Sequence, residues 1–233
     1  MSFTNGKMKP RYIVVIPAYN EGSVIGHVLE EVLTYSRDIV VVDDGSTDAT
    51  AKIALKFPVV LLRHPINLGA GAAMQTGFEY ACTLPVDYVV TIDADGQHDP
   101  SEIPRMVETC RKGHFDVVLG SRFIEGAAAL NIGRFRRAVL KLATVFTKFV
   151  TGLKVTDTHN SFRVFTRMSV CKIHMKQNGY AHSSELLKQI AKAKLKYTEA
   201  PVTVRYTEYS KKKGQSTWNL INLLWDMVSE EIK

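Results

Sequence analysis

Cysteine is scarce in this sequence of 233 residues. The three cysteines, Cys82, Cys110 and Cys171, are widely spaced and odd in number. No Cys-x-x-Cys pair and no Cys/His spacing typical of a zinc site occurs, which excludes a disulfide-rich scaffold and a zinc module. We therefore expect a cytoplasmic chain whose thiols are reduced.

Long apolar runs are also lacking. The apolar run before Pro17 has only five residues, which is too short for a signal peptide. Nowhere do about 18 consecutive apolar residues occur, as a membrane-spanning helix requires. The sequence predicts a protein that is soluble, or peripheral at the cytoplasmic face of a membrane.

The charge is unbalanced toward lysine and arginine, which number 30 against 23 acidic residues, a net charge of +7. Such a balance favours phosphate-rich partners, namely nucleic acid, nucleotides or an anionic membrane surface. No helix-turn-helix, RRM, KH or zinc pattern is present, so we expect no nucleic-acid partner. Hydrophobic residues make up 45%, which indicates a globular chain.

Short apolar runs alternate with helical patterns over the first 120 residues. Runs of this kind are typical of strands buried on both faces, in a mostly parallel sheet covered by helices. The sequence thus predicts an open α/β sheet with helices on both faces. The expected strands are Tyr12–Ile16, Ile39–Val42, Val59–Leu62, Tyr88–Ile92 and Val117–Leu119, and the expected helices are Glu21–Tyr35, Asp48–Phe57, Gly69–Cys82 and Pro100–Arg111.

The regular alternation of strands and helices ends at about residue 126, although no linker there separates two domains. A basic amphipathic helix is expected over Asn131–Gly152, a further helix over Ser183–Lys194 and a strand over Ala200–Tyr206. The last part, residues 211–233, combines a basic loop with an amphipathic helix that carries two tryptophans on one face. This helix could pack on the core or lie on a membrane. We expect one domain over residues 1–233, with a first half at 11–125 and a second at 126–210.

Acidic residues follow the predicted strands. Asp43 and Asp44 follow the second strand, and Asp93 and Asp95 follow the fourth. A single acidic strand end is usually a helix cap or a solvated turn. Because the carboxyl ends of parallel strands share one edge, several such ends bring carboxylates together, and these repel each other unless a cation compensates them. Two carboxylates at i and i+2 suit Mg²⁺ or Mn²⁺.

The segments VVIPAYNE, IVVVDDGSTDAT, HPINLGAGAAMQTGF, VVTIDADGQHDP and VVLGSRF, in this order, resemble glycosyltransferase family 2. Within it they are most similar to the branch of dolichyl- and polyprenyl-phosphate sugar synthases. The match covers about residues 11–167 and weakens beyond. The resemblance implies a GT-A fold, a nucleotide diphosphate sugar donor, a divalent metal (Mg²⁺ or Mn²⁺) and an inverting hexosyl transfer to a polyprenyl phosphate or lipid-linked glycan.

The resemblance also implies roles for individual residues. Donor binding is expected at Pro17, Ala18, Tyr19, Glu21, Asp44, Asp93, Ala94 and Lys213; metal binding at Asp95 and Gln97; catalysis at Asp95, Arg122 and Arg134; and acceptor-phosphate binding at Arg134, Arg136 and Arg137. A lipid phosphate is already ionised near neutral pH and needs no general base. A sugar hydroxyl in a growing polysaccharide would need one, for which Asp157 and Glu185 are the candidates.

Two alternatives remain open from the sequence. The glycines at 69–73 imitate a dinucleotide-binding fingerprint, but they follow the third strand rather than the first. The chain could also be a subunit that binds a nucleotide sugar without transferring it. A membrane surface or a membrane-protein partner is expected if the acceptor is a lipid.

Overall fold

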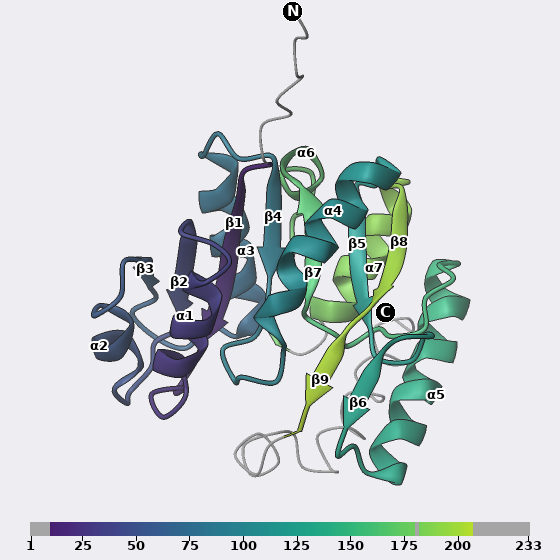
Figure 1. Cartoon of the computed structure of the whole chain (residues 1–233). Helices are drawn as coiled ribbons and strands as arrows, with labels where there is room; N and C mark the ends of the chain where they lie inside the picture. The colour runs from purple at the N-terminus through teal and green to yellow at the C-terminus, as the bar shows by residue number, and fades with distance from the viewer. Residues whose placement is uncertain (1–9, 180–181, 207–233) are drawn as a thin grey trace, which may run out of the picture.

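The computed structural model describes residues 10–179 and 182–206, and its centre is a seven-stranded sheet (Figure 1). The strand order is β3-β2-β1-β4-β7-β5-β8. The strands are β1 (Tyr12–Ala18), β2 (Ile39–Asp43), β3 (Val60–Arg63), β4 (Tyr88–Thr91), β5 (Val117–Ser121), β7 (Arg163–Thr166) and β8 (Tyr197–Pro201). The predicted mostly parallel sheet is confirmed.

One strand of this sheet was not predicted. β7 runs antiparallel between β4 and β5, pairing Arg163 with Thr91 on one side and with Leu119 on the other. All other pairings in the sheet are parallel. The chain reverses direction at β7, so its first residue, Arg163, lies beside Thr91, the last residue of β4, and beside Leu119 in β5. This places a buried arginine at the edge where the candidate site forms.

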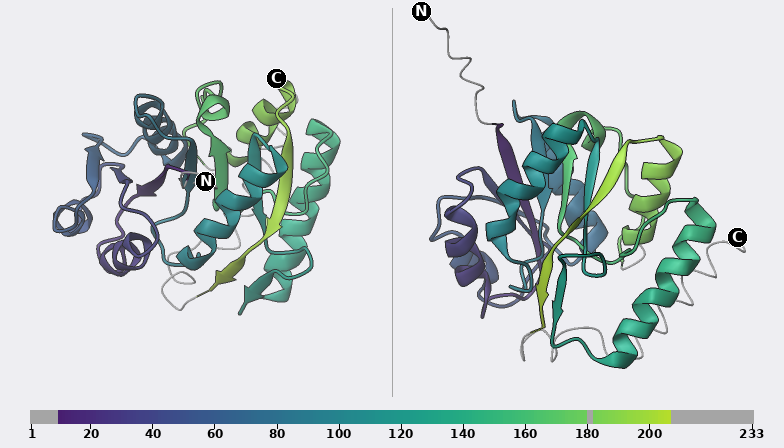
Figure 2. Two further views of the ribbon diagram at one scale, coloured as in Figure 1. Left: turned by 45° about the horizontal axis from the view of Figure 1, so that its top comes forward. Right: turned by 45° about the vertical axis from the view of Figure 1, so that its right-hand side comes forward.

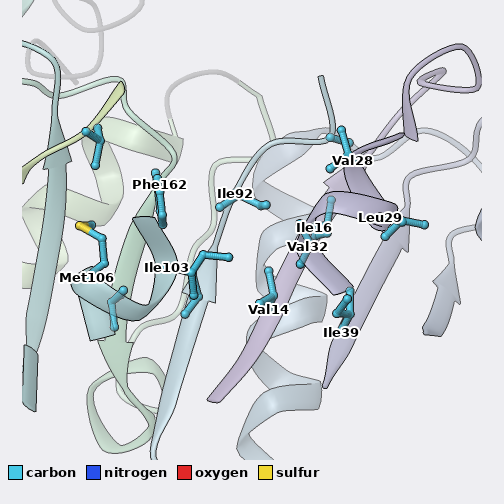
Figure 3. Close-up of a cluster of buried hydrophobic side chains, with 14 of the residues drawn as sticks. Val14, Ile16, Val28, Leu29, Val32, Ile39, Ile92, Ile103, Met106 and Phe162 are labelled. Atoms are coloured by element: carbon cyan, nitrogen blue, oxygen red, sulfur yellow. The ribbon is translucent and has the colours of Figure 1, made fainter. Parts of the chain in front are cut away.

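Helices cover both faces of the sheet, as predicted (Figures 1 and 2). They are α1 (Ile25–Leu33), α2 (Thr50–Ala54), α3 (Ala70–Cys82), η1 (Pro100–Glu102), α4 (Ile103–Gly113), α5 (Arg134–Thr151), α6 (Arg167–Val170) and α7 (His182–Lys192). Side chains from α1, α2 and α4 join one buried cluster, and those from α3, α6 and α7 join another. Figure 3 shows the first cluster, with Val28, Leu29 and Val32 of α1 packed beside the strands.

The expected helix over Glu21–Tyr35 begins only at Ile25. The buried residues of α1 keep the spacing of one helical face, at Ile25, Val28, Leu29 and Val32. The preceding residues instead form a loop, in which the backbone amide of Asn20 donates to Ser46 after β2 and that of Glu21 donates to Thr50 at the start of α2.

A small second sheet extends the main one at the carboxyl end of its strands. It pairs β6 (Ala128–Leu130) with β9 (Thr203–Arg205) in parallel. The expected strand over Ala200–Tyr206 is therefore split between β8 and β9. The long helix α5 follows β6 (Figure 1).

The cysteines correct the expectation of three reduced thiols. Cys82 and Cys171 form a disulfide across 89 residues of sequence, and Cys110 is buried and free. Cys82 ends α3 and Cys171 directly follows α6. The antiparallel β7 returns the chain to α3, where Arg167 donates to the carbonyl of Cys82. This proximity follows from the topology, which the spacing of the cysteines does not encode.

Within the described part of the chain, no helix has both the length and the apolar character needed to cross a bilayer. The basic loop with Lys213 and the expected amphipathic helix lie outside the described residues.

Candidate active site

The candidate site lies at the edge formed by the carboxyl ends of β1, β2, β4 and β5. β1 pairs in parallel with β2 and β4, and β5 points the same way because β7 is antiparallel to both β4 and β5. In open α/β sheets this is the edge where ligands bind. The sequence-predicted residues Pro17, Asp44, Asp93 and Arg122 are therefore brought to one edge.

The loops after β1 and β2 hold each other. Ser46 Oγ accepts from the amide of Asn20 at 2.9 Å, and Asn20 Oδ1 accepts from the amide of Thr47 at 2.9 Å. Thr50 Oγ1 accepts from the amide of Glu21 at 2.8 Å. Asn20 itself has a φ of 53°, in the left-handed region that asparagine tolerates. The predicted donor segment 17–21 thus consists of the last two residues of β1 and the loop that follows them, in which Tyr19 is exposed.

Asp44 is buried and organises the loop before α3. Its carboxylate accepts from the amides of Leu68 at 2.9 Å and Gly69 at 2.7 Å, and it contacts His64 Nδ1 at 2.7 Å. Gly69 has a φ of 106°, and a Cβ there would lie 2.2 Å from the carbonyl oxygen of Asn178. Both features favour glycine, so the glycines at 69–73 start a closely packed helix. In this structure the carboxylate of Asp44 shapes the site wall.

Asp93 and Asp95 follow β4 and differ in their electrostatic surroundings. Loss of solvent around Asp93 would by itself raise its pKa. A hydrogen bond and the charge of His98, together with a hydrogen bond from Ser161, outweigh this effect and lower the pKa of Asp93. His98 Nε2 lies 3.5 Å from Asp93 Oδ2. Burial raises the pKa of Asp95 to about 6, with further increase from Asp93 and Glu21. Of the two carboxylates, Asp95 is therefore the one whose charged form is the less favoured.

Gln97 lies beside Asp95. Its side-chain amide donates to Asp95 Oδ2 at 2.6 Å, and its backbone amide donates to Asp95 Oδ1 at 3.0 Å. The carbonyl of Gln97 accepts from the amide of Arg205 in β9 at 2.8 Å. The small sheet thus anchors the turn that carries both predicted metal ligands.

Arg122 forms a buried salt bridge with Asp157. Its Nε and Nη2 donate to the two carboxylate oxygens at 2.6 Å each, and Nη1 donates to the hydroxyl of Tyr206 at 2.7 Å. Burial alone would lower the pKa of Arg122, but Asp157 and Tyr206 raise it, and Arg122 in turn lowers the pKa of Asp157 despite its burial. Both predicted roles, catalysis for Arg122 and general base for Asp157, would require this pairing to change.

The other predicted residues are less closely gathered. Arg134, Arg136 and Arg137 lie in the first turn of α5, and the side chain of Arg137 is exposed. The carboxylate of Glu185 accepts from the backbone amides of residues 176 and 177 at 2.7–2.9 Å, and so holds the loop before α7.

Sequence reasoning missed a buried arginine behind the acidic pair. Arg163 at the start of β7 is buried, and its pKa falls to about 10 because burial outweighs the attraction of Asp93 and Asp157. Its guanidinium donates to the carbonyl of Thr158 at 3.3 Å. Arg163 lies in the segment NSFRVFTR (residues 160–167), which also resembles the family branch, and this resemblance was the signal in the sequence that could have identified it.

The donor set suits a hard divalent cation that is also bound by its substrate. Among the described residues, no three His, Cys, Asp or Glu side chains form a metal cluster. Mg²⁺ and Mn²⁺ sites commonly use one or two carboxylates and complete their coordination with phosphate oxygens and water. Burial and the neighbouring Asp93 raise the pKa of Asp95, so a bound cation would stabilise its charged form. Asp95 and Gln97 therefore fit the group.

The chain belongs to glycosyltransferase family 2. The family model, described as Glycosyl transferase family 2, matches residues 13–174. A UDP-N-acetylglucosamine–dolichyl-phosphate N-acetylglucosaminyltransferase of Methanococcus voltae is 31% identical, with 86% of this chain and 88% of the relative covered. A polyprenol monophosphomannose synthase of Mycolicibacterium smegmatis is 29% identical, with 83% and 77% covered.

Solved structures confirm the α/β fold as GT-A-like. A glucosyl-3-phosphoglycerate synthase of Mycobacterium tuberculosis, crystallised with Mn²⁺, UDP and phosphoglyceric acid, superimposes with a TM-score of 0.67. It is 18% identical, with 94% of this chain and 78% of that chain covered. The chain is thus a family 2 glycosyltransferase whose relatives include dolichyl- and polyprenyl-phosphate sugar transferases.

Proposed function

We propose that the protein transfers a hexose, with inversion, from a nucleoside diphosphate sugar to a polyprenyl phosphate or a lipid-linked glycan. The observation that carries this proposal is the acidic pair after β4, in which the pKa of Asp95 is raised to about 6. A carboxylate so poorly compensated is suited to a cation that arrives with an anionic donor. The named relatives support the class of acceptor.

Asp95 and Gln97 would hold Mg²⁺ or Mn²⁺ together with the donor diphosphate. The metal would supply positive charge that stabilises the departing nucleoside diphosphate. Asp93, the first carboxylate of the pair, would contact the donor sugar or ribose. The end of β1 and the loop after it (residues 17–21) would bind the nucleoside, with Asp44 holding the facing wall in place through the amides of Leu68 and Gly69.

An ionised lipid phosphate is favoured over a sugar hydroxyl as acceptor. A phosphate oxygen attacks without a general base, whereas a hydroxyl must lose its proton. Asp157 is paired with Arg122 through two 2.6 Å contacts, and Glu185 accepts from backbone amides. Neither carboxylate is poised to take a proton. The arginines in the first turn of α5 would hold the acceptor phosphate, because one guanidinium group can donate two parallel hydrogen bonds to two phosphate oxygens.

Donor binding is tested by thermal unfolding of the full chain with UDP-, GDP- and TDP-sugars, each with Mn²⁺ and with EDTA. At a hundred times Kd, a bound donor adds about 2.7 kcal/mol of stability. One nucleotide should stabilise the protein only with metal, and Asp95→Asn should remove that effect. A donor shift that is equal with EDTA would contradict the metal assignment.

Transfer is tested with polyprenyl phosphate and, as matched control, the unphosphorylated polyprenol. Product should form only with the phosphate. Arg137→Glu should raise the acceptor KM at least tenfold and leave the donor KM unchanged, while Lys192→Glu on α7 should change neither. Donor binding without transfer to any lipid would instead identify a subunit that binds a nucleotide sugar without turning it over.

A further inference from the structure

Strand β9 holds the segment that follows the acidic pair, residues 97–102, at both of its ends. The backbone amide of Arg205 donates to the carbonyl of Gln97 at 2.8 Å. The backbone amide of Thr203 donates to Glu102 Oε2 at 3.0 Å. β9 therefore meets this segment at the residue predicted to bind metal and again at the residue before α4.

The side chain of Arg205 contacts the same segment a second time. Its Nη2 pairs with Asp99 Oδ2 at 2.5 Å, and the two side chains are 46% and 21% exposed. Asp99 Oδ1 accepts from the backbone amide of Ser101 at 3.0 Å and from its hydroxyl at 2.6 Å, and so caps η1. Arg205 thus binds the chain on both sides of His98, at Gln97 through its amide and at Asp99 through its guanidinium.

The residues between these contacts are buried. Val204 forms an isolated β-bridge with His98, and the two residues are 3% and 6% exposed. The ring of His98 packs edge-on against Phe162, with 5.6 Å between the ring centroids. Packing therefore fixes the inner side of the turn, whereas the partly exposed pair of Arg205 and Asp99 fixes its outer side.

We propose that Arg205 is a positioning residue for the divalent cation, because it fixes the turn from which Gln97 and Asp95 would bind Mg²⁺ or Mn²⁺. Groups that orient a metal ligand raise the affinity for the metal, since a ligand already held in place loses less conformational freedom on binding. Gln97 Nε2 donates to Asp95 Oδ2 at 2.6 Å, so a shift of the turn would displace both ligands together. The inference rests on the metal site of the proposed function, whereas the contacts of Arg205 are observed independently of it.

The strength of the ion pair limits the size of the effect, and its sign separates positioning from charge. The largest expected change in metal affinity is about fivefold, which corresponds to about 1 kcal/mol for a partly exposed pair. Charge alone would act in opposite directions at the two members. Loss of the Arg205 cation would favour a bound Mn²⁺, and loss of the Asp99 anion would disfavour it. Positioning instead predicts that both losses weaken binding alike.

The Mn²⁺ dependence of donor binding tests this role in the full chain. Thermal unfolding is followed at a fixed concentration of the nucleotide sugar that stabilises wild type, and the Mn²⁺ concentration that gives half of the full shift is determined. Arg205→Gln and Asp99→Asn should each raise this concentration about threefold to fivefold, and the full shift should return at saturating Mn²⁺. The asparagine keeps an oxygen that can cap η1. The double variant should show no further rise, because both changes remove the same pair.

The matched control is Arg111→Gln on α4. Arg111 pairs with Glu108 at 2.7 Å, with side chains 35% and 37% exposed, but this pair joins residues three apart in one helix. The control removes the same charge and should leave the half-saturating Mn²⁺ concentration unchanged. Arg205→Lys keeps a cation beside Asp99 and should recover part of the lost affinity. In EDTA the two glutamine variants should unfold at similar temperatures.

The positioning role is overturned if Arg205→Gln leaves the half-saturating Mn²⁺ concentration unchanged or lowers it, if Arg111→Gln raises it equally, or if the double variant shows additive rises. A much lower unfolding temperature of Arg205→Gln in EDTA, with Asp99→Asn binding Mn²⁺ as wild type does, would also overturn it. If wild type itself shows no Mn²⁺-dependent shift with any nucleotide sugar, the metal site of the proposed function fails, and the role of Arg205 fails with it. A metal-dependent shift in wild type that Arg205→Gln leaves unaltered contradicts the positioning role alone.

Discussion

Asp95→Asn should make the metal-free protein more stable at neutral pH while removing its metal-dependent function. The pKa of Asp95 rises from 3.8 to about 6 because of burial and the neighbouring Asp93 and Glu21. A rise of about 2 pKa units corresponds to about 3 kcal/mol between the charged and neutral forms. The neutral amide avoids this cost, and Gln97 can turn its own amide to keep the hydrogen bond.

The pH dependence follows from the direction of the shift. The folded state holds a proton on Asp95 between about pH 4 and pH 6, where the unfolded chain has lost it. Stability from this group is therefore fully present below about pH 4 and is lost as pH rises through about 6. The variant should gain up to about 3 kcal/mol at pH 7.5, and the gain should vanish near pH 4.

Urea unfolding followed by circular dichroism, in EDTA at pH 4.5, 6.0 and 7.5, measures this gain. The control is Asp38→Asn, whose side chain is 52% exposed at 3.9 Å from Arg11 and which should change stability by less than about 1 kcal/mol. Destabilisation of Asp95→Asn at pH 7.5, or a gain independent of pH, would refute the electrostatic argument.

Three other changes should reveal which contacts stabilise the fold. Asp157→Asn leaves its buried arginine partner uncompensated and should cost about 3–5 kcal/mol in urea unfolding; a loss below about 1 kcal/mol would show that water solvates the pair. Reduction of Cys82–Cys171 should cost about 2–4 kcal/mol, measured as a fall in melting temperature with reductant that the double serine variant does not show. Gly71→Ala places a Cβ 1.9 Å from a backbone oxygen in the loop before α7 and should destabilise by about 1–3 kcal/mol, whereas Gly133→Ala, with nothing within 4 Å, should not.

The local pattern of the sequence was enough to predict the first five strands and the helices between them. Runs such as Ile39–Val42 are continuous and apolar because both faces are covered, and β2 is buried throughout. β7 escaped prediction because its four residues, Arg163–Thr166, follow a turn-rich segment and show no clear run. Its place is set by pairing with β4 and β5, which are distant in sequence. Local periodicity carries no record of such pairing.

The residue types at the candidate site could be predicted, but their partners could not. The sequence placed carboxylates after β2 and β4 because strand ends share an edge. It could not show that Asp44 would accept from the amides of Leu68 and Gly69, or that Arg122 would pair with Asp157 across 35 residues. Both contacts depend on loops that meet only in the folded chain.

The distribution of charge at the edge explains why Asp95, rather than Asp93, is the proposed metal ligand. Asp157 is neutralised by Arg122, and Asp93 lies in the field of Arg163 and His98. The remaining carboxylate, Asp95, has the charges of Asp93 and Glu21 among the causes that raise its pKa. The antiparallel β7 contributes to this difference, because it brings in Arg163, which attracts Asp93. A cation bound with a diphosphate would be drawn to that position first.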